Sequence, residues 1–143
     1  MIGVLLVDDH PVMRDLLREI LDQFHDVTVI AEAASGEDAV REATRLQPAI
    51  AIVDIQLPTM SGIEACKLIR LSSPCTAVIG LTAGERGYKD LSMISAGATS
   101  VINKAEVVNG LHEAILEAVN KAASDIVPET KLRSLTSQLS PRK

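Results

Sequence analysis

Apolar residues in this chain fall into five short continuous runs, at 2–7, 27–31, 49–53, 76–81 and 99–102. Within these runs the residues do not alternate with polar ones. Such runs are typical of parallel strands that are buried on both faces. The pattern therefore predicts five strands in one sheet, with helices covering both of its faces.

Between the runs, apolar residues recur every three or four positions, which predicts amphipathic helices. The expected helices follow the strands in turn, at 11–21, 36–46, 62–70, 84–95 and 105–121. Alternating strands and helices predict an α/β fold, a doubly wound three-layer sandwich around a parallel sheet.

Particular residues support the helix starts and weaken one helix. Ser35 and Ser61 each precede an acidic residue by three positions, which is typical of a capping serine. Gly87 inside the fourth helix lowers its helical propensity. In the last helix we expect the inward face to carry Val108, Leu111, Ile115 and Val119.

Length and tail composition predict the domain organisation. With 143 residues, 47% of them hydrophobic, the chain can bury one domain core but not two of ordinary size. We expect this domain to span 1–121. The remaining segment, 122–143, is polar and contains two prolines, which is typical of a linker.

Charge and composition argue against several classes of function. The net charge is -5, and the single Tyr, single Phe and absence of Trp leave no base-stacking platform, so we expect no nucleic-acid binding by this segment alone. No apolar run approaches the length of a membrane span, and the start carries no basic leader. Cys66 and Cys75 fit neither a redox nor a metal motif. A cytoplasmic protein without membrane contact is expected.

Polar side chains follow four of the five predicted strands. Asp8 and Asp9 come after the first strand, Asp54 after the third, Thr82 after the fourth and Lys104 after the fifth. Because the carboxyl ends of parallel strands meet at one edge of the sheet, we expect these side chains to converge there.

Three acids, a hydroxyl and an amine suit a divalent cation held beside a phosphoryl group. Two carboxylates about 4 Å apart repel by roughly 4 kcal/mol at an effective dielectric constant of about 20, and Mg²⁺ would relieve this repulsion. Asp54 could then act as a nucleophile that takes up a phosphoryl group, while Thr82 and Lys104 contact its oxygens. Taken singly, each residue has an ordinary alternative: a helix cap, a loop former, a strand-end threonine or a solvated charge.

Four motifs in order, VLLVDDH, VDIQLPTMSG, GLTA and GATSVINK, resemble those of bacterial response-regulator receiver domains, over residues 1–121. The resemblance implies a flavodoxin-like sheet with strand order 2-1-3-4-5. It also implies that Asp54 is the phosphoacceptor and that the domain catalyses its own Mg²⁺-dependent phosphoryl transfer and dephosphorylation without being an enzyme in the usual sense. Thr82 and Lys104 would contact the phosphoryl group.

The resemblance also implies a metal site, in which Asp9 and Asp54 bind Mg²⁺, Asp8 assists and the Gln56 carbonyl contributes a ligand. Two positions depart from the common receiver pattern. Val101 stands where many receivers carry Tyr or Phe, so coupling of Thr82 to an aromatic switch residue is not assumed. Ala105 follows the lysine where many receivers have a cis-proline, so a trans peptide is expected.

The opening DDHPVMRDLL resembles the NarL/FixJ branch, whose receivers precede a LuxR-type helix-turn-helix domain, and the closing LSPRK resembles the start of such a domain. The implied partners are a sensor histidine kinase, a C-terminal DNA-binding domain of the same protein and a second copy of the chain. Two alternatives stay open. One is a stand-alone receiver or pseudo-receiver that acts only through protein contacts. The other is a HAD-type phosphatase, although neither acidic motif supplies its DxD pattern.

Overall fold

The computed structural model describes residues 1–84 and 87–125, which form a five-stranded parallel sheet in the order β2-β1-β3-β4-β5. The strands are β1 (Ile2–Val7), β2 (Val27–Ala33), β3 (Ile50–Asp54), β4 (Ala77–Thr82) and β5 (Ala98–Asn103). The helices are α1 (Pro11–Asp22), α2 (Gly36–Leu46), α3 (Gly62–Ser72), α4 (Tyr88–Ser95) and α5 (Val107–Asp125). The predicted fold class and strand order are confirmed.

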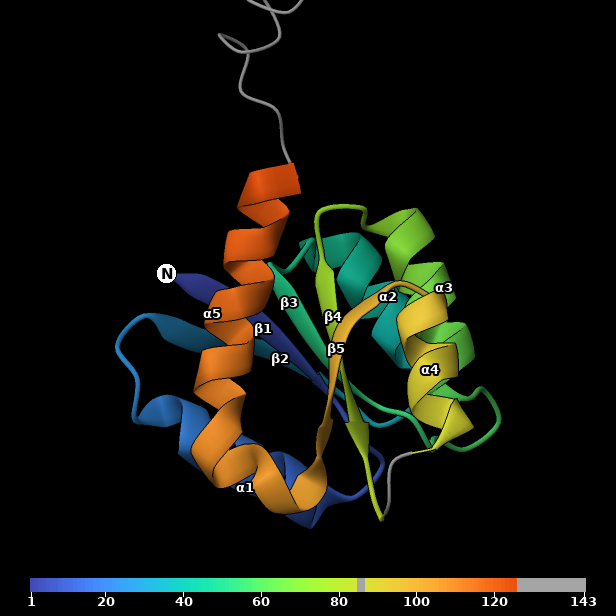
Figure 1. Ribbon diagram of the computed structural model, residues 1–143, viewed down its shortest axis with the longest axis horizontal. Coiled ribbons are helices and arrows are strands. Elements are labelled where there is room, and N and C mark those ends of the chain that lie inside the picture. Colours follow the sequence, from blue (N-terminus) through green and yellow to red (C-terminus); the bar gives the residue numbers. More distant parts are fainter. Residues whose placement is uncertain (85–86, 126–143) are drawn as a thin grey trace, which may run out of the picture.

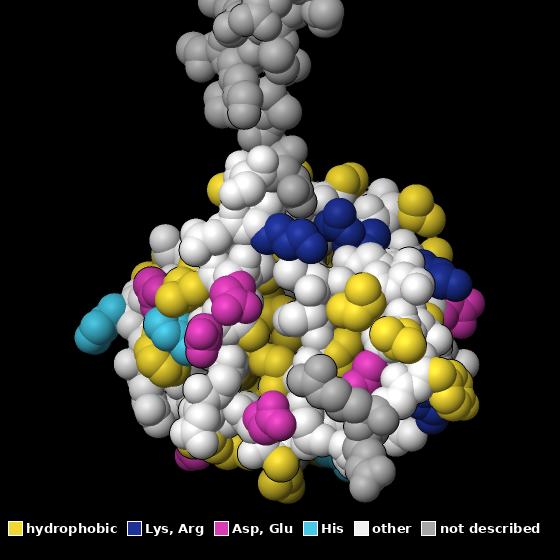
Figure 2. Space-filling model, in the orientation of Figure 1, with side chains coloured by type: hydrophobic (Ala, Val, Ile, Leu, Met, Phe, Trp, Pro, Cys, Tyr) yellow, Lys and Arg dark blue, Asp and Glu magenta, His cyan; other side chains and the backbone are white. Residues whose placement is uncertain are grey.

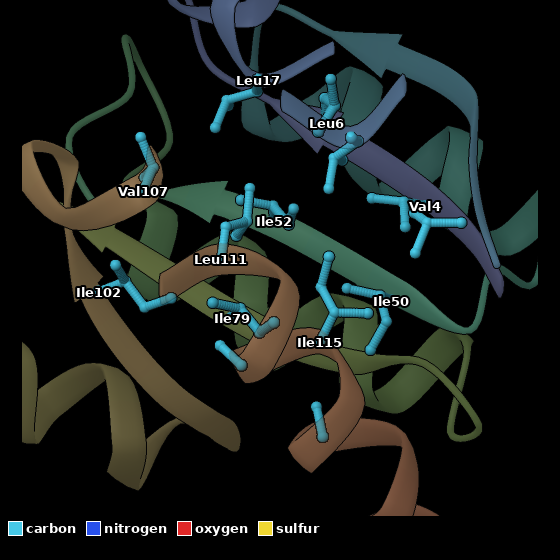
Figure 3. Close-up of a cluster of buried hydrophobic side chains, with 14 of the residues drawn as sticks. Val4, Leu6, Leu17, Ile50, Ile52, Ile79, Ile102, Val107, Leu111 and Ile115 are labelled. Carbon is cyan, nitrogen blue, oxygen red and sulfur yellow. The ribbon is translucent and has the colours of Figure 1, made fainter. Parts of the chain in front are cut away.

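Helices cover both faces of the sheet, as the continuous apolar strands predicted (Figure 1). On one face, α1 and α5 pack against Val4, Leu6 and alternate residues of the neighbouring strands (Figure 3). On the other face, α2, α3 and α4 pack against Leu5, Val7 and the intervening residues. Alternate residues of each strand thus enter opposite cores. A polar substitution on either face would therefore remove buried apolar surface and lower the stability of the fold.

Two predicted helix caps are present, and one of the two cysteines is a core residue. The Ser35 and Ser61 hydroxyl groups each accept a hydrogen bond, at 3.2 Å, from the backbone amide three residues later. These bonds satisfy amides that have no partner within the helix. Cys66 is buried, and burial raises the pKa of its thiol to about 11, so it acts as a small apolar core residue.

The fourth helix is shorter than predicted. It begins at Tyr88, with Gly87 as its N-cap, rather than at Gly84. Gly84 has a φ of 87°, in the left-handed region, so it cannot form part of a right-handed helix. Gly87, expected inside the helix, instead lies just before its first residue.

The last helix is preceded by a 3-10 turn, η1 (Lys104–Glu106), in which the Asn103 side chain accepts a hydrogen bond from the Ala105 amide at 2.8 Å. No cis peptide bond occurs in residues 1–84 and 87–125, so the bond before Ala105 is trans as expected. The prediction that Val108 faces inward was wrong. It is 66% exposed, and Val107 is buried instead, so the inward stripe runs through Val107, Leu111 and Ile115 at four-residue spacing.

Helix α5 continues to Asp125, four residues beyond the predicted end of the domain. The rest of the predicted linker, and the closing LSPRK, lie outside the described residues. Figure 2 shows Lys and Arg side chains in a small group near the C-terminal end of α5, with acidic side chains spread over the rest of that face. Among the described helices, none combines the length and apolar character needed to cross a membrane.

Candidate functional site

The three carboxylates meet at the carboxyl edge of the sheet. Strands β1 and β3 are neighbours, with Val7 paired to Val53, so Asp8 and Asp54 follow paired residues. One ligand atom from each of Asp8, Asp9, Asp54 and His10 can be chosen so that all lie within 4.8 Å of one another. The predicted convergence of the three acids is therefore observed.

Lys104 holds two of these acids together from the end of β5. Its Nζ donates to Asp54 Oδ2 at 2.9 Å and lies 3.1 Å from Asp8 Oδ2. The second oxygen of each acid meets a backbone amide: Asp8 Oδ1 accepts from His10 N at 2.9 Å, and Asp54 Oδ1 accepts from Gln56 N at 3.0 Å. Both carboxylates are almost completely buried. These contacts fix the orientation of the Asp54 side chain.

Burial and neighbouring charges shift the pKa values of Asp54 and Lys104, and the two causes can be distinguished. Burial raises the pKa of Asp54 above its usual value, and this effect exceeds the opposing hydrogen bonds from Lys104 and Gln56; the charge of Asp8 raises it further. Burial alone would lower the pKa of Lys104, but its hydrogen bond to Asp54 and its close contact with the Asp8 carboxylate outweigh that effect and raise it. Lys104 therefore stays charged, whereas the Asp54 carboxylate is destabilised by its surroundings.

The raised pKa of Asp54 predicts a pH dependence of stability. The pKa of Asp54 is higher in the folded than in the unfolded protein. Its contribution to the free energy of unfolding is therefore fully present below its usual pKa of 3.8, and it is lost as pH rises through the raised pKa. In EDTA, the unfolding free energy of the wild type should fall relative to that of Asp54→Asn, which cannot titrate, between about pH 4 and about pH 7. Urea unfolding at both pH values checks this, and a constant difference would contradict it.

A pocket of about 230 Å³ opens beside Asp54. Gln56 and Thr82 line it, together with Tyr88 and Lys89 from the first turn of α4. In the part of the chain that the structure describes, Asp54 is the only one of the three acids that lines this pocket. A molecule that enters the pocket therefore contacts both Asp54 and Thr82.

Gly62 keeps the loop after β3 close to this site. Its amide donates to the Ile55 carbonyl at 2.8 Å. A Cβ added at Gly62 would lie 2.7 Å from Ile55 Cα and closer still to the Asp54 carbonyl oxygen. Both are backbone atoms, so a larger residue here would displace the turn that orients Asp54.

The donor set fits a hard divalent cation. In residues 1–84 and 87–125, Asp8 Oδ2 and Asp9 Oδ1 are buried side-chain oxygens without a hydrogen-bond partner, although Lys104 forms an ion pair with the first. Buried oxygens of this kind require compensation, and carboxylate oxygens are the ligands that Mg²⁺ favours. The Gln56 carbonyl, which the resemblance adds to this set, stays a prediction.

The structure adds two neighbours of the site that the sequence pattern did not identify. His10 is the N-cap of α1, and its Nδ1 lies 3.0 Å from Asp8 Oδ1 and 3.3 Å from Asp9 Oδ1. Lys89 lines the pocket, a position that depends on where α4 starts. At Val101, where many receivers carry an aromatic residue, the aliphatic side chain is partly buried and packs against the core cluster that contains Met93.

Comparison with known proteins agrees with this geometry. The response regulator receiver domain family matches residues 4–116. The response regulator UvrY of Escherichia coli K12 is 32% identical over 147 residues, an alignment that covers all of this chain and 65% of UvrY. The chain thus spans about two thirds of the length of this relative.

Solved structures give the same result. The response regulator domain of Thermotoga maritima CheB has a TM-score of 0.79 and 32% identity, covering 90% of this chain and 99% of that one. A LuxR-family two-component response regulator from Aurantimonas sp. SI85-9A1 has a TM-score of 0.74 and 25% identity, covering 87% and 96%. These relatives support the NarL/FixJ branch that the opening motif indicated. The chain belongs to the response regulator receiver domain family, of which it carries the sheet and the acidic edge.

Proposed function

We propose that this receiver domain accepts a phosphoryl group on Asp54 from a sensor histidine kinase and changes conformation in response. One observation carries the assignment to Asp54: of the three clustered acids, it lines the pocket beside the site, while Asp8 and Asp9 do not. An incoming phosphorus atom must reach the nucleophile, so the acid at the pocket wall is the one available to attack.

Neighbouring side chains support the transfer. An Asp54 carboxylate oxygen would form the new bond to phosphorus while the bond from phosphorus to the donor breaks and the donor leaves with that electron pair. Lys104, 2.9 Å from Asp54 Oδ2, would supply positive charge to a phosphoryl oxygen, and Thr82 would donate a hydrogen bond to another. Contacts made by these side chains only after transfer would favour a second conformation.

Asp9 and Asp54 would hold Mg²⁺, with Asp8 assisting and the Gln56 carbonyl as a further ligand. A bound Mg²⁺ would neutralise the repulsion between the phosphoryl oxygens and the acidic edge. We propose that the domain catalyses both its own phosphorylation and the later hydrolysis of the aspartyl phosphate in this way. The two buried oxygens without hydrogen-bond partners support a cation at this place.

Intact-mass measurement tests the proposal directly. Incubated with Mg²⁺ and a small phosphodonor such as acetyl phosphate, the protein should gain one phosphoryl group, and excess EDTA should prevent the gain. Asp9→Ala should require more Mg²⁺, because one carboxylate ligand is lost. A chain that gains no mass would instead be a pseudo-receiver acting through protein contacts, and turnover of the donor without a protein-bound phosphoryl group would favour a phosphatase.

We further propose that residues 1–121 act as the receiver of a longer cytoplasmic transcription regulator, joined through 122–143 to a LuxR-type DNA-binding domain. The DDHPVMRDLL opening, the LSPRK segment and the 65% coverage of UvrY support this arrangement. A second copy of the chain is a further proposed partner, since α4 exposes Tyr88, Leu91 and Ile94.

A further inference from the structure

Arg14 connects helix α1 to the backbone of the acidic loop. Its Nη1 donates to the Asp8 carbonyl oxygen at 2.6 Å. The side chain is only 18% exposed, so the contact is largely shielded from water. A charged donor on a backbone carbonyl makes a strong hydrogen bond, and it acts on the residue that lies between β1 and Asp9.

A second contact fixes the other side of the same guanidinium group. Arg14 Nε donates to Glu32 Oε1 at 3.2 Å, and Glu32 belongs to the edge strand β2. Arg18 also pairs with this carboxylate, through Nε at 3.1 Å and through Nη2. Because one of its N–H groups binds a strand residue and another binds the loop, the planar guanidinium can adopt few orientations.

A backbone hydrogen bond holds the other end of the same residue. The Asp8 amide donates to the Ala33 carbonyl at 3.1 Å, which ties the start of the loop to the end of β2. Arg14 holds the carbonyl of the same residue, and beyond it the chain turns toward Asp9. Residue 8 is thus bound through both its amide and its carbonyl.

We infer that Arg14 is a positioning residue of the acidic site, which sets the path of the Asp8–Asp9 backbone and thereby the arrangement of the metal-binding carboxylates. The inference rests on the proposed function, because it concerns the same Mg²⁺ site. Arg14 contacts no carboxylate of that site; it acts through the Asp8 carbonyl.

Charge and position make opposite predictions for Mg²⁺ binding. Arg14 is a cation near the site, so a purely electrostatic role would mean that its removal strengthens Mg²⁺ binding. A positioning role means that its removal weakens binding, and loss of a group that orients metal ligands commonly costs about 10-fold to 100-fold in affinity. The sign of the change therefore distinguishes the two roles.

The test is an NMR titration with Mg²⁺ alone, following the amide resonances of Asp9 and Asp54. Arg14→Met should bind Mg²⁺ at least about 10-fold more weakly than the wild type. Arg18→Met is the matched control. It removes an equal charge from the same helix and breaks a contact with the same carboxylate, Glu32, but it leaves the hydrogen bond between Arg14 and the Asp8 carbonyl in place. It should bind Mg²⁺ as tightly as the wild type or slightly more tightly.

Arg14→Lys keeps the positive charge but loses the planar guanidinium, so it shows which of the two supports Mg²⁺ binding. An ammonium group cannot reproduce the two directed contacts of the guanidinium, so binding should stay weaker than in the wild type. Equal affinity in the wild type and Arg14→Met, tighter binding in Arg14→Met, or full recovery in Arg14→Lys would each overturn the inference. A wild type that binds no Mg²⁺ would overturn the proposed metal site and this inference with it, whereas a failure of the inference alone leaves wild-type binding intact.

Discussion

Asp54→Asn should abolish phosphorylation, with no gain in intact mass under conditions that label the wild type. The amide cannot attack phosphorus, because its nitrogen lone pair is delocalised into the carbonyl and it carries no negative charge. The substitution is nearly isosteric and keeps an oxygen that can accept from the Gln56 amide, which now donates to Asp54 Oδ1 at 3.0 Å. The loss should therefore reflect chemistry rather than misfolding.

Asp15→Asn is the matched control, because Asp15 is an exposed carboxylate on α1 outside the site. It should be labelled like the wild type, and the label should be released by base, as expected of an acyl phosphate. Circular dichroism of both variants should match that of the wild type. Persistent single labelling of Asp54→Asn would show that another residue accepts the phosphoryl group.

Gly62→Ala should destabilise the domain by about 1–3 kcal/mol or more, the usual cost of overpacking a site that cannot relax. The added Cβ would overlap the Asp54 carbonyl oxygen, and only a movement of the backbone can relieve that overlap. Because the displaced backbone carries Asp54, phosphorylation by a small phosphodonor should slow as well. Urea unfolding measures the first effect, and the rate of mass gain measures the second.

Gly110→Ala gives the opposite expectation and so serves as the control. Gly110 lies inside α5, and a Cβ added there meets nothing within 4 Å beyond its chain neighbours and the nearby backbone of its own helix. Replacing a helical glycine by alanine should then stabilise the domain by up to about 1 kcal/mol. If both substitutions changed the unfolding free energy in the same direction, the close approach at Gly62 would not explain its effect.

Sequence alone determined the architecture and most of the candidate site. Five apolar runs without alternation are sufficient to predict buried parallel strands, because such strands lose contact with water on both faces. Convergence of Asp8, Asp54, Thr82 and Lys104 follows from the same argument, since strand ends in a parallel sheet share an edge. These inferences depend on local pattern and on chain direction, both of which can be read from the sequence.

Other features depend on contacts between distant segments, so only the tertiary structure decided them. Local periodicity could not place the start of α4 at Tyr88, because that start depends on the conformation of Gly84. Nor could it decide that Val107 is buried and Val108 exposed, because both residues lie at the start of α5, directly after the turn at Lys104–Glu106. The role inferred for Arg14 was also hidden. Its spacing four residues after His10 placed it near the loop, but its second partner, Glu32, lies 18 residues away on β2. Packing of the edge strand beside α1 brings that carboxylate within reach, and no pattern within the chain reports such a contact.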